Sequence, residues 1–197
     1  MPPKFVFIRH GEAEHNVGFH AEGVSAFSNE KYRDSKLTEK GIEQARAAGQ
    51  KIAKEVSMDF IDIWCSPLSR CIQTAEEIFE EVNCDTLYLH DNLLECLGGN
   101  HICNERMSKT EIAKIRAGWI TTYLPNTPSH WIERENRYSV RTRMLMFVFF
   151  LADLYKDHSE KEYVLVVSHK DAIFELTGKS MDNAEYVVAT VEDVSKL

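Results

Sequence analysis

Phe5-Val-Phe-Ile-Arg-His-Gly-Glu12 is the stretch that decides the fold of this chain. Its first four residues are apolar and typical of a β-strand, and they end abruptly in an arginine, a histidine and a glycine. In an open α/β sheet, ligands bind in the crevice beyond the carboxyl ends of the strands, so Arg9 and His10 are expected at a binding site. We expect Gly11 to let the backbone turn sharply and to let a ligand approach closely. A cation beside an imidazole indicates an anionic ligand.

The composition fits one globular domain. The chain has 197 residues, of which 44% are hydrophobic and 27% charged, enough for a substantial core. Its formal charge of −8 argues against nonspecific binding of nucleic acid, so an anionic substrate needs a local cluster of arginine and histidine. The longest apolar run, Met144 to Leu151, is too short to span a bilayer and is interpreted as the buried middle of a helix.

The cysteine pattern and the N-terminus bear on the compartment. Five cysteines without a C-x-x-C pair predict free thiols, and no apolar run near the N-terminus is long enough for a signal peptide. We therefore expect a cytoplasmic protein that has no membrane partner.

Strand and helix patterns alternate along the sequence. Strands are predicted at Phe5–Ile8, Phe60–Trp64, Thr86–Leu89 and Tyr163–Val167, and Asn183–Thr190 is expected to end the fold. Helices are predicted after an N-cap at Thr38, after Ser66 as N-cap with Pro67 at the first helical position, near Ser108–Ala117, and from about Asn136 to Lys156. This alternation predicts an α/β fold with a mostly parallel sheet and helices on both faces. Tyr163–Val167 is the most apolar strand, as expected of a central one.

Residues 96–136 interrupt the alternation. This segment contains Gly98-Gly99, Pro125 and Pro128, and we interpret it as a cap or long excursion within a single domain spanning residues 1–197. Cys96, His101 and Cys103 lie within the segment, but their spacing matches no common zinc pattern, so no metal is expected.

Two further strand ends repeat the polar pattern of the first. Arg70 lies in the first turn after Ser66-Pro67, and His169 directly follows the strand Tyr163–Val167. A cation at a helix N-terminus is mildly disfavoured, unless it is a solvated surface arginine or an anion lies beside it. If these strands are neighbours, then Arg9, His10, Arg70 and His169 converge. Arginine binds phosphate oxygens in a bidentate manner and histidine is a covalent catalyst, so the set suits a phosphoryl group.

Five motif blocks resemble those of the histidine phosphatase superfamily, whose founding members are phosphoglycerate mutases. The blocks are Arg9-His-Gly-Glu-Ala-Glu-His-Asn16, Asp34-x-x-Leu-Thr-x-x-Gly-x-x-Gln-Ala45, Ser66-Pro-Leu-x-Arg-x-x-Gln-Thr-Ala75, Leu93-Leu-Glu95 and Val167-Ser-His169. They occur in the expected order, and together they cover the chain from residue 5 to about residue 180.

The resemblance implies a role for each matching residue. His10 would attack phosphorus and become phosphohistidine, while Arg9, Arg70, His169 and Asn16 would bind the phosphoryl oxygens. Glu95 would protonate the leaving alcohol and then deprotonate the hydrolytic water. Glu12 and Glu14 are alternatives to Glu95, and Asn16 fits a helix N-cap equally well. The implied activity is that of a phosphomonoester hydrolase of the histidine acid phosphatase type, without cofactor or metal and with a small phosphorylated substrate.

Within the excursion, residues 95–108 are similar to a plant and fungal branch of phosphoglycerate-mutase-like proteins, in which His101 and Arg106 are candidate substrate contacts. Cofactor-dependent mutases follow their acid with Arg-x-Tyr-Gly, whereas Cys96-Leu-Gly-Gly stands here. A phosphoglycerate-type mutase and an inactive module that binds a phosphorylated ligand remain alternatives. Specificity is expected from residues 96–136 and from a loop at Val17–Arg33. Monomer and homodimer both remain open.

Overall fold

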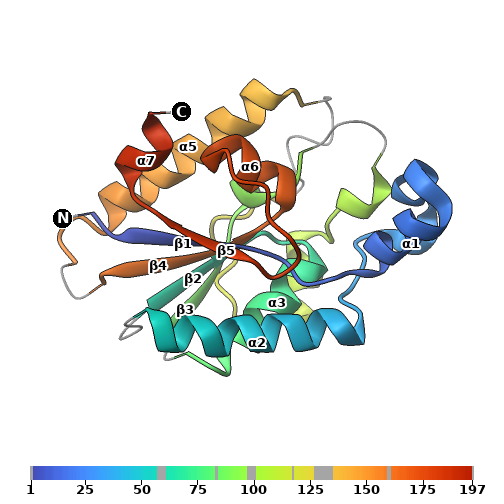
Figure 1. The fold of residues 1–197 in the computed structure, drawn as a ribbon, viewed down its shortest axis with the longest axis horizontal. Helices are drawn as coiled ribbons and strands as arrows, with labels where there is room; N and C mark the ends of the chain where they lie inside the picture. Colours follow the sequence, from blue (N-terminus) through green and yellow to red (C-terminus); the bar gives the residue numbers. More distant parts are fainter. Residues whose placement is uncertain are drawn as a thin grey trace.

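A five-stranded sheet runs through the centre of the computed structural model, which describes residues 2–56, 61–82, 84–96, 101–116, 118–126, 135–158 and 161–196 (Figure 1). The strands lie in the order β3-β2-β4-β1-β5. They span Lys4–Arg9 (β1), Ile61–Cys65 (β2), Cys84–Leu89 (β3), Tyr163–Ser168 (β4) and Tyr186–Ala189 (β5). The first four strands are parallel, and β5 pairs antiparallel with β1. The predicted mostly parallel sheet with β4 at its centre is confirmed.

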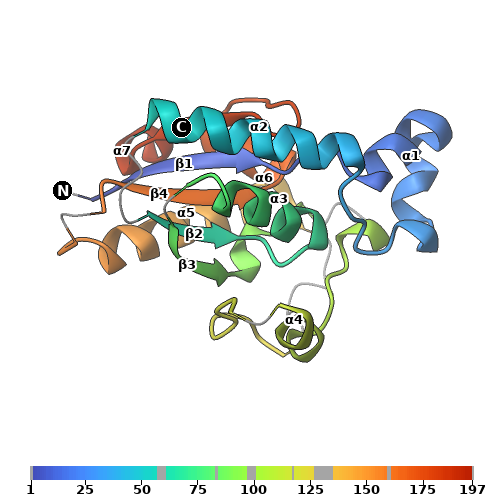
Figure 2. The ribbon, with the colours of Figure 1, turned by 90° about the horizontal axis from the view of Figure 1, so that it is seen from below.

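Helices cover both faces of this sheet (Figures 1 and 2). One face carries α2 (Glu39–Glu55) and α3 (Ser69–Phe79), and the other carries α5 (Arg137–Leu154), α6 (Lys170–Thr177) and α7 (Val191–Ser195). Side chains alternate across a strand, so Val6 and Ile8 join the core under α2 and α3, while Phe5 and Phe7 join the core under α5.

The turn after β1 packs against the start of α2. Thr38 caps this helix as predicted, because its Oγ1 accepts a 3.0 Å hydrogen bond from the Gly41 amide. A Cβ on Gly11 would lie 2.3 Å from the Gly41 carbonyl oxygen, and one on Gly41 would lie 2.0 Å from that of Glu12. The close approach of the α2 backbone therefore requires glycine at position 11.

The start of α3 also differs from its prediction. The helix begins at Ser69, two residues beyond Pro67, and Leu68 occupies the N-cap position without a side-chain hydrogen bond. Ser66 is used elsewhere, since its amide donates to Val167 O and its hydroxyl contacts His169. The Asp34 carboxylate caps α3 instead, accepting from the Ser69 amide and hydroxyl at 2.8 Å each.

The described part of the segment 96–136 (residues 96, 101–116, 118–126, 135 and 136) is partly helical. It contains the short 3₁₀ helix η4 (Ile102–Asn104) and α4 (Lys109–Ile115), which begins after Ser108 as predicted. Ile120 exchanges backbone hydrogen bonds with Leu87 and Leu89, which covers the β3 edge of the sheet. Ile112, Trp119 and Leu124 are buried in the same core as α2 and α3. Phe60, Gly98, Gly99, Ala117 and Pro128, which entered the sequence analysis, lie outside the described residues.

Three further expectations are corrected. The segment expected as a loop at Val17–Arg33 is largely helical, containing most of α1 (Glu14–Glu22) and the 3₁₀ helices η1 (Gly23–Ser28) and η2 (Glu30–Tyr32). The run at 144–151 is buried only on the side that faces the sheet, because α5 lies on the surface. Its outer side chains are substantially exposed: Met146, Phe149 and Phe150. The fold ends in α7, one element beyond Asn183–Thr190.

Among the described residues, no helix is long and apolar enough to cross a membrane.

Candidate active site

The strand order brings the predicted site residues together. β4 lies between β1 and β2, so the carboxyl ends of these three strands meet. A cavity of about 440 Å³ opens there. It is lined by the end of β1, by α1 and η1, by the starts of α3 and α6, and by residues from two connecting segments: Arg9, His10, His15, Asn16, Phe19, His20, Phe27, Arg70, Glu95, Cys96, His101, Cys103, Asn104, Lys170, Asp171, Asp182 and Asn183.

His10 is held with one ring nitrogen committed to the backbone. Its Nδ1 lies 2.7 Å from the Gly11 carbonyl oxygen, which can only accept, so Nδ1 carries the proton. Nε2 then bears the lone pair and has no hydrogen-bond partner among the described residues. Burial lowers the pKa of His10 well below its usual value, and the nearby Arg70 charge lowers it further. The imidazole is therefore neutral and suited to nucleophilic attack.

Two arginines face this cavity with unused donors. Arg70 is only 1% exposed, which rules out the solvated surface position that the sequence left open. It donates from Nη1 to Cys103 O and from Nη2 to Asn104 Oδ1, both at 2.8 Å. Arg9 donates from Nη1 to Met181 O at 2.9 Å. The buried Nε atoms of both arginines lack a hydrogen-bond partner in the described part of the chain. Unpaired buried donors on two cations favour an anionic ligand.

His169 lies beside His10, although its side chain does not line the cavity. The two ring centroids are 5.2 Å apart, and His169 is completely buried. Arg70 Nη2 donates toward its Nδ1 at 3.3 Å, so Nε2 carries the proton and donates to Ser66 Oγ at 2.8 Å. Burial keeps its pKa well below the usual value. Both ring nitrogens are thus engaged within the protein.

Glu95 reaches the cavity at the start of α6. Its Oε1 accepts from the amides of Cys96 (2.8 Å) and Ala172 (3.1 Å). Burial raises the pKa of Glu95, and the neighbouring Asp171 charge adds to this effect. A carboxyl group with a raised pKa is suited to donate a proton near neutral pH.

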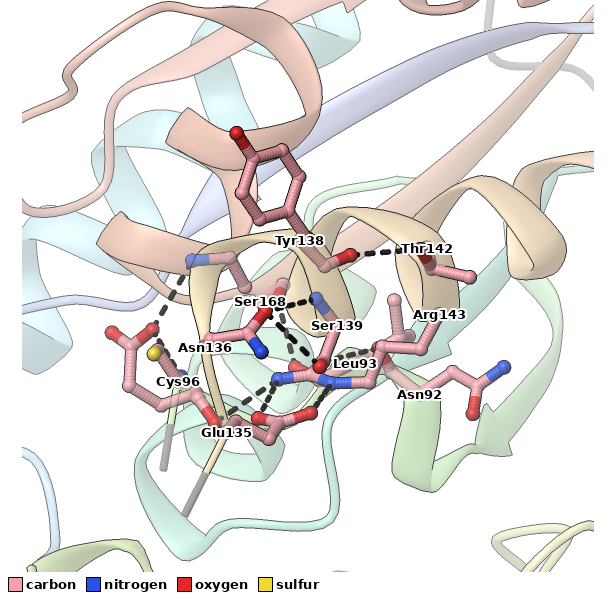
Figure 3. A network of polar contacts seen from close by, with 12 residues as sticks. Asn92, Leu93, Cys96, Glu135, Asn136, Tyr138, Ser139, Thr142, Arg143 and Ser168 are labelled. Carbon is pink, nitrogen blue, oxygen red and sulfur yellow. Dashed lines mark hydrogen bonds and ion pairs between the residues drawn. The ribbon is translucent and has the colours of Figure 1, made fainter. Parts of the chain in front are cut away.

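Arg143 on α5 anchors the backbone that presents Glu95 (Figure 3). It pairs with Glu135 at 2.7 Å and donates to the carbonyl oxygens of Asn92 (2.7 Å) and Glu95 (3.1 Å). Ser168 Oγ holds the same segment from the end of β4, donating to Leu93 O at 2.8 Å. The position of Glu95 is therefore tied to both α5 and β4.

Of the remaining predicted contacts, Asn16 and His101 line the cavity and Arg106 does not. Asn16 lines the cavity but is not an N-cap, because it follows Ala13 by three positions and its Oδ1 accepts from the Ala13 amide. His101 lines the cavity near Phe27. Arg106 does not line the cavity, which contradicts its candidacy as a substrate contact. Its guanidinium is completely buried in a bidentate pair with Asp91, and donates also to two carbonyl oxygens.

The sequence interpretation gave no individual role to several lining residues. Four of them come from the segment expected as a loop or from its helical start: His15, Phe19, His20 and Phe27. Asn183 was also missed; its Nδ2 donates to His10 O at 3.1 Å, so the chain before β5 supports the nucleophile. In the described ranges, no group of three or more His, Cys, Asp and Glu side chains is arranged to hold a metal. A second hollow, of about 510 Å³, lies between α2 and residues 179–187 and contains no histidine or arginine.

Comparison with known proteins agrees with this geometry. Residues 5–185 match the histidine phosphatase superfamily (branch 1), and the chain belongs to that family. A probable phosphatase of Schizosaccharomyces pombe is 30% identical over 168 residues, which are 83% of this chain and 51% of the relative. A 2,3-bisphosphoglycerate-dependent phosphoglycerate mutase of Lactiplantibacillus plantarum is 40% identical over 78 residues, 40% of this chain and 30% of the mutase. The chain thus spans about half of the first relative and less than a third of the second.

Solved structures show the same fold. The ecdysone phosphate phosphatase of Bombix mori, in complex with tungstate, superposes with a TM-score of 0.70 at 14% identity, covering 94% of this chain and 88% of that one. A mycobacterial glucosyl-3-phosphoglycerate phosphatase in complex with VO3 gives 0.61 at 20% identity, with coverage of 94% and 92%.

Proposed function

We propose that this chain is a phosphatase that hydrolyses phosphate monoesters through a phosphohistidine on His10. The observation that carries the proposal is the tautomer of His10, in which Nδ1 is committed to Gly11 O and Nε2 keeps a lone pair beside two arginines. The family membership and the similarity to a probable phosphatase support the same activity.

In the first step, Nε2 attacks phosphorus and the bond between phosphorus and the ester oxygen breaks. Glu95 gives its proton to that oxygen, so the leaving group departs as an alcohol. Arg9 and Arg70 neutralise the phosphoryl oxygens, with Asn16 at the cavity wall. For His169 to contact the phosphate, one of its ring nitrogens must give up its hydrogen bond to Ser66 or to Arg70.

In the second step, the Glu95 carboxylate takes a proton from water, and the resulting nucleophile attacks the phosphohistidine. Phosphate leaves and Nε2 regains its lone pair, which restores the starting state. Because two guanidinium groups supply the positive charge, we propose that the reaction needs no metal. Full activity after dialysis against EDTA is the expected result.

The decisive experiment compares His10→Ala with the wild-type protein on 4-nitrophenyl phosphate, with His158→Ala as a control outside the cavity. We expect His10→Ala to lose at least about 1,000-fold in kcat and to trap no phosphoryl group in rapid-quench mass spectrometry. Activity retained in His10→Ala would refute the mechanism.

The partial similarity to phosphoglycerate mutases gives a second candidate function, in which the phosphohistidine returns its phosphoryl group to the substrate. Incubation with 2- and 3-phosphoglycerate separates the two. We expect release of inorganic phosphate, whereas isomerisation without release would assign a mutase. Tungstate and vanadate should inhibit in either case, because both oxyanions fit the phosphoryl position.

A further inference from the structure

Two phenylalanine rings line the cavity without belonging to any core. Phe19 and Phe27 are stacked, with ring centroids 5.2 Å apart and planes within 5° of parallel. Neither ring is part of the three apolar clusters of the described residues. Phe19 is 41% exposed and Phe27 is half-buried. Because these rings contribute little to the core, their burial on a ligand remains available as binding energy.

The rings continue a line of aromatic groups that starts at the nucleophile. His10 and His15 have centroids 5.9 Å apart, and His15 is 6.3 Å from Phe27. Phe27 also contacts His101 across the cavity wall, at 5.0 Å. We call Phe19, Phe27 and His101 the aromatic wall. It begins one ring away from His10, in the wall of the same cavity.

His15, the ring between His10 and the aromatic wall, carries no charge that would attract a second anion. Asn16 Nδ2 donates to its Nε2 at 3.1 Å, so its proton lies on Nδ1, 2.6 Å from Ser35 Oγ. Burial lowers its pKa to about 2, which keeps the ring neutral. The ring between the nucleophile and the aromatic wall is therefore neutral.

Contacts within the protein hold the aromatic wall in place. Ala26, next to Phe27, is completely buried, and the Tyr32 ring lies directly against Gly18, where a Cβ would be only 2.3 Å away. Glu22 accepts hydrogen bonds from Tyr32 and Asn29, which ties the end of α1 to η2. Arg33 forms an ion pair with Glu105, so the segment that carries both phenylalanines is linked to the segment that carries His101. A preformed surface saves the ordering cost of binding.

We propose that the aromatic wall is the leaving-group subsite, and that the substrates are phosphate monoesters whose alcohol carries an aromatic ring close to the ester oxygen. This inference rests on the proposed phosphatase function. Stacked and edge-on ring contacts favour a flat aromatic group over an alkyl group of similar size. The carboxyl and ammonium groups of Glu95 and Lys170 line the same cavity and are available to the ester oxygen.

The test uses three esters whose leaving oxygens all sit on a CH₂ group: benzyl, cyclohexylmethyl and ethyl phosphate. Their leaving alcohols are similarly poor, so differences in kcat/KM report binding of the side group. We expect benzyl phosphate to exceed ethyl phosphate by about tenfold, with cyclohexylmethyl phosphate well below benzyl. Phe27→Leu and Phe19→Leu should each reduce the ratio of benzyl to ethyl phosphate, while Phe149→Leu, on the outer face of α5, should preserve it. Because Phe19 is 41% exposed and lies outside the apolar cores, we expect its variant to stay folded even if that of Phe27 does not.

The outcomes separate the two proposals. Hydrolysis of no ester by the wild type overturns the phosphatase function, and calorimetry with benzylphosphonate and ethylphosphonate still decides the subsite. Preferential binding of benzylphosphonate, reduced in Phe19→Leu, supports it. Two results would overturn the subsite. One is equal turnover or binding of the benzyl and cyclohexylmethyl compounds, and the other is a preference for the benzyl compound that neither Phe19→Leu nor Phe27→Leu changes.

Discussion

Asn104 holds Arg70 in the cavity: its Oδ1 accepts a 2.8 Å hydrogen bond from Arg70 Nη2, and both side chains are buried. Asn104 belongs to η4 in the excursion, whereas Arg70 lies in the first turn of α3. A residue outside the five motif blocks thus orients a residue inside one of them. Together with the Cys103 carbonyl, Asn104 leaves Nε of Arg70 as its unpaired donor among the described residues.

Substitution of Asn104 should therefore weaken catalysis through Arg70. We expect Asn104→Ala to lower kcat/KM for 4-nitrophenyl phosphate by about 10-fold and to weaken inhibition by tungstate in parallel, because a misdirected guanidinium binds the phosphoryl oxygens less well. Asn126→Ala, at an exposed position of the same excursion, is the control. If Asn104→Ala lowers the melting temperature while kcat/KM and tungstate affinity stay unchanged, the positioning role is wrong.

The raised pKa of Glu95 gives the rate a definite dependence on pH. A general acid acts in its protonated form, so kcat/KM should fall as the pH rises through the Glu95 pKa. The lowered pKa of His10 keeps the nucleophile neutral at pH values where a free histidine is already protonated, so protonation of His10 should not reduce the rate there.

The comparison of wild type with Glu95→Gln isolates this effect, because the second ionisation of the substrate, near pH 6, is common to both proteins. We expect Glu95→Gln to lose about 10²–10⁴ in kcat/KM on an alkyl ester and to lose the alkaline decline. A decline that persists in Glu95→Gln would assign the proton donor to another group.

The sequence predicted the chemistry of the strand ends better than their surroundings. Arg9 and His10 come at the end of one apolar strand, and Arg70 lies in the first helical turn after another. Parallel strands place their carboxyl ends together, so the convergence of these residues could be derived from local patterns. The cap of α3 could not be derived from local patterns. Asp34 reaches Ser69 from a distant segment, whereas Ser66 forms hydrogen bonds with Val167 on β4 and with His169. Hydrogen bonds between distant segments decide which residue caps the helix, and the spacing of neighbouring residues in the sequence does not reveal them.

The aromatic wall was missed for a related reason. The sequence of α1 has no apolar stripe, since only His15 and Gly18 are buried in it, and its shape depends on tertiary contacts such as Tyr32 on Gly18. By contrast, α7 had a readable signal: Thr190 and Asp193 form a capping box with the spacing that starts a helix.

Arg106 should prove to be a stabilising residue and not a substrate contact. Its removal leaves the Asp91 carboxylate buried beside an empty volume, so we expect Arg106→Met to lower the free energy of unfolding by about 3–5 kcal/mol. Adding Asp91→Leu removes the unpaired charge and should recover most of this loss. Urea unfolding measures both effects. A variant with unchanged stability and a raised KM would restore Arg106 to the binding site.

Buried neutral histidines should make the fold sensitive to acid. Burial lowers the pKa of His10, His15 and His169 below the value of about 6.5 that histidine has in the unfolded chain. Above pH 6.5 neither state binds these protons, and below it only the unfolded state does, so stability is lost as the pH falls. For His15, whose pKa in the folded state is about 2, the contribution to this loss should be about 2 kcal/mol by pH 5.

His15 offers the cleanest measurement, because its pKa of about 2 keeps it neutral in the folded state throughout this range. In His15→Asn the amide can still donate to Ser35, but the titrating ring is gone. We expect urea unfolding at pH 7.5 and pH 5 to show an acid-induced loss about 2 kcal/mol smaller in His15→Asn than in wild type. His20→Asn, which replaces an exposed histidine, should keep the wild-type loss. An identical loss in His15→Asn and wild type would show that His15 gains its proton within the fold.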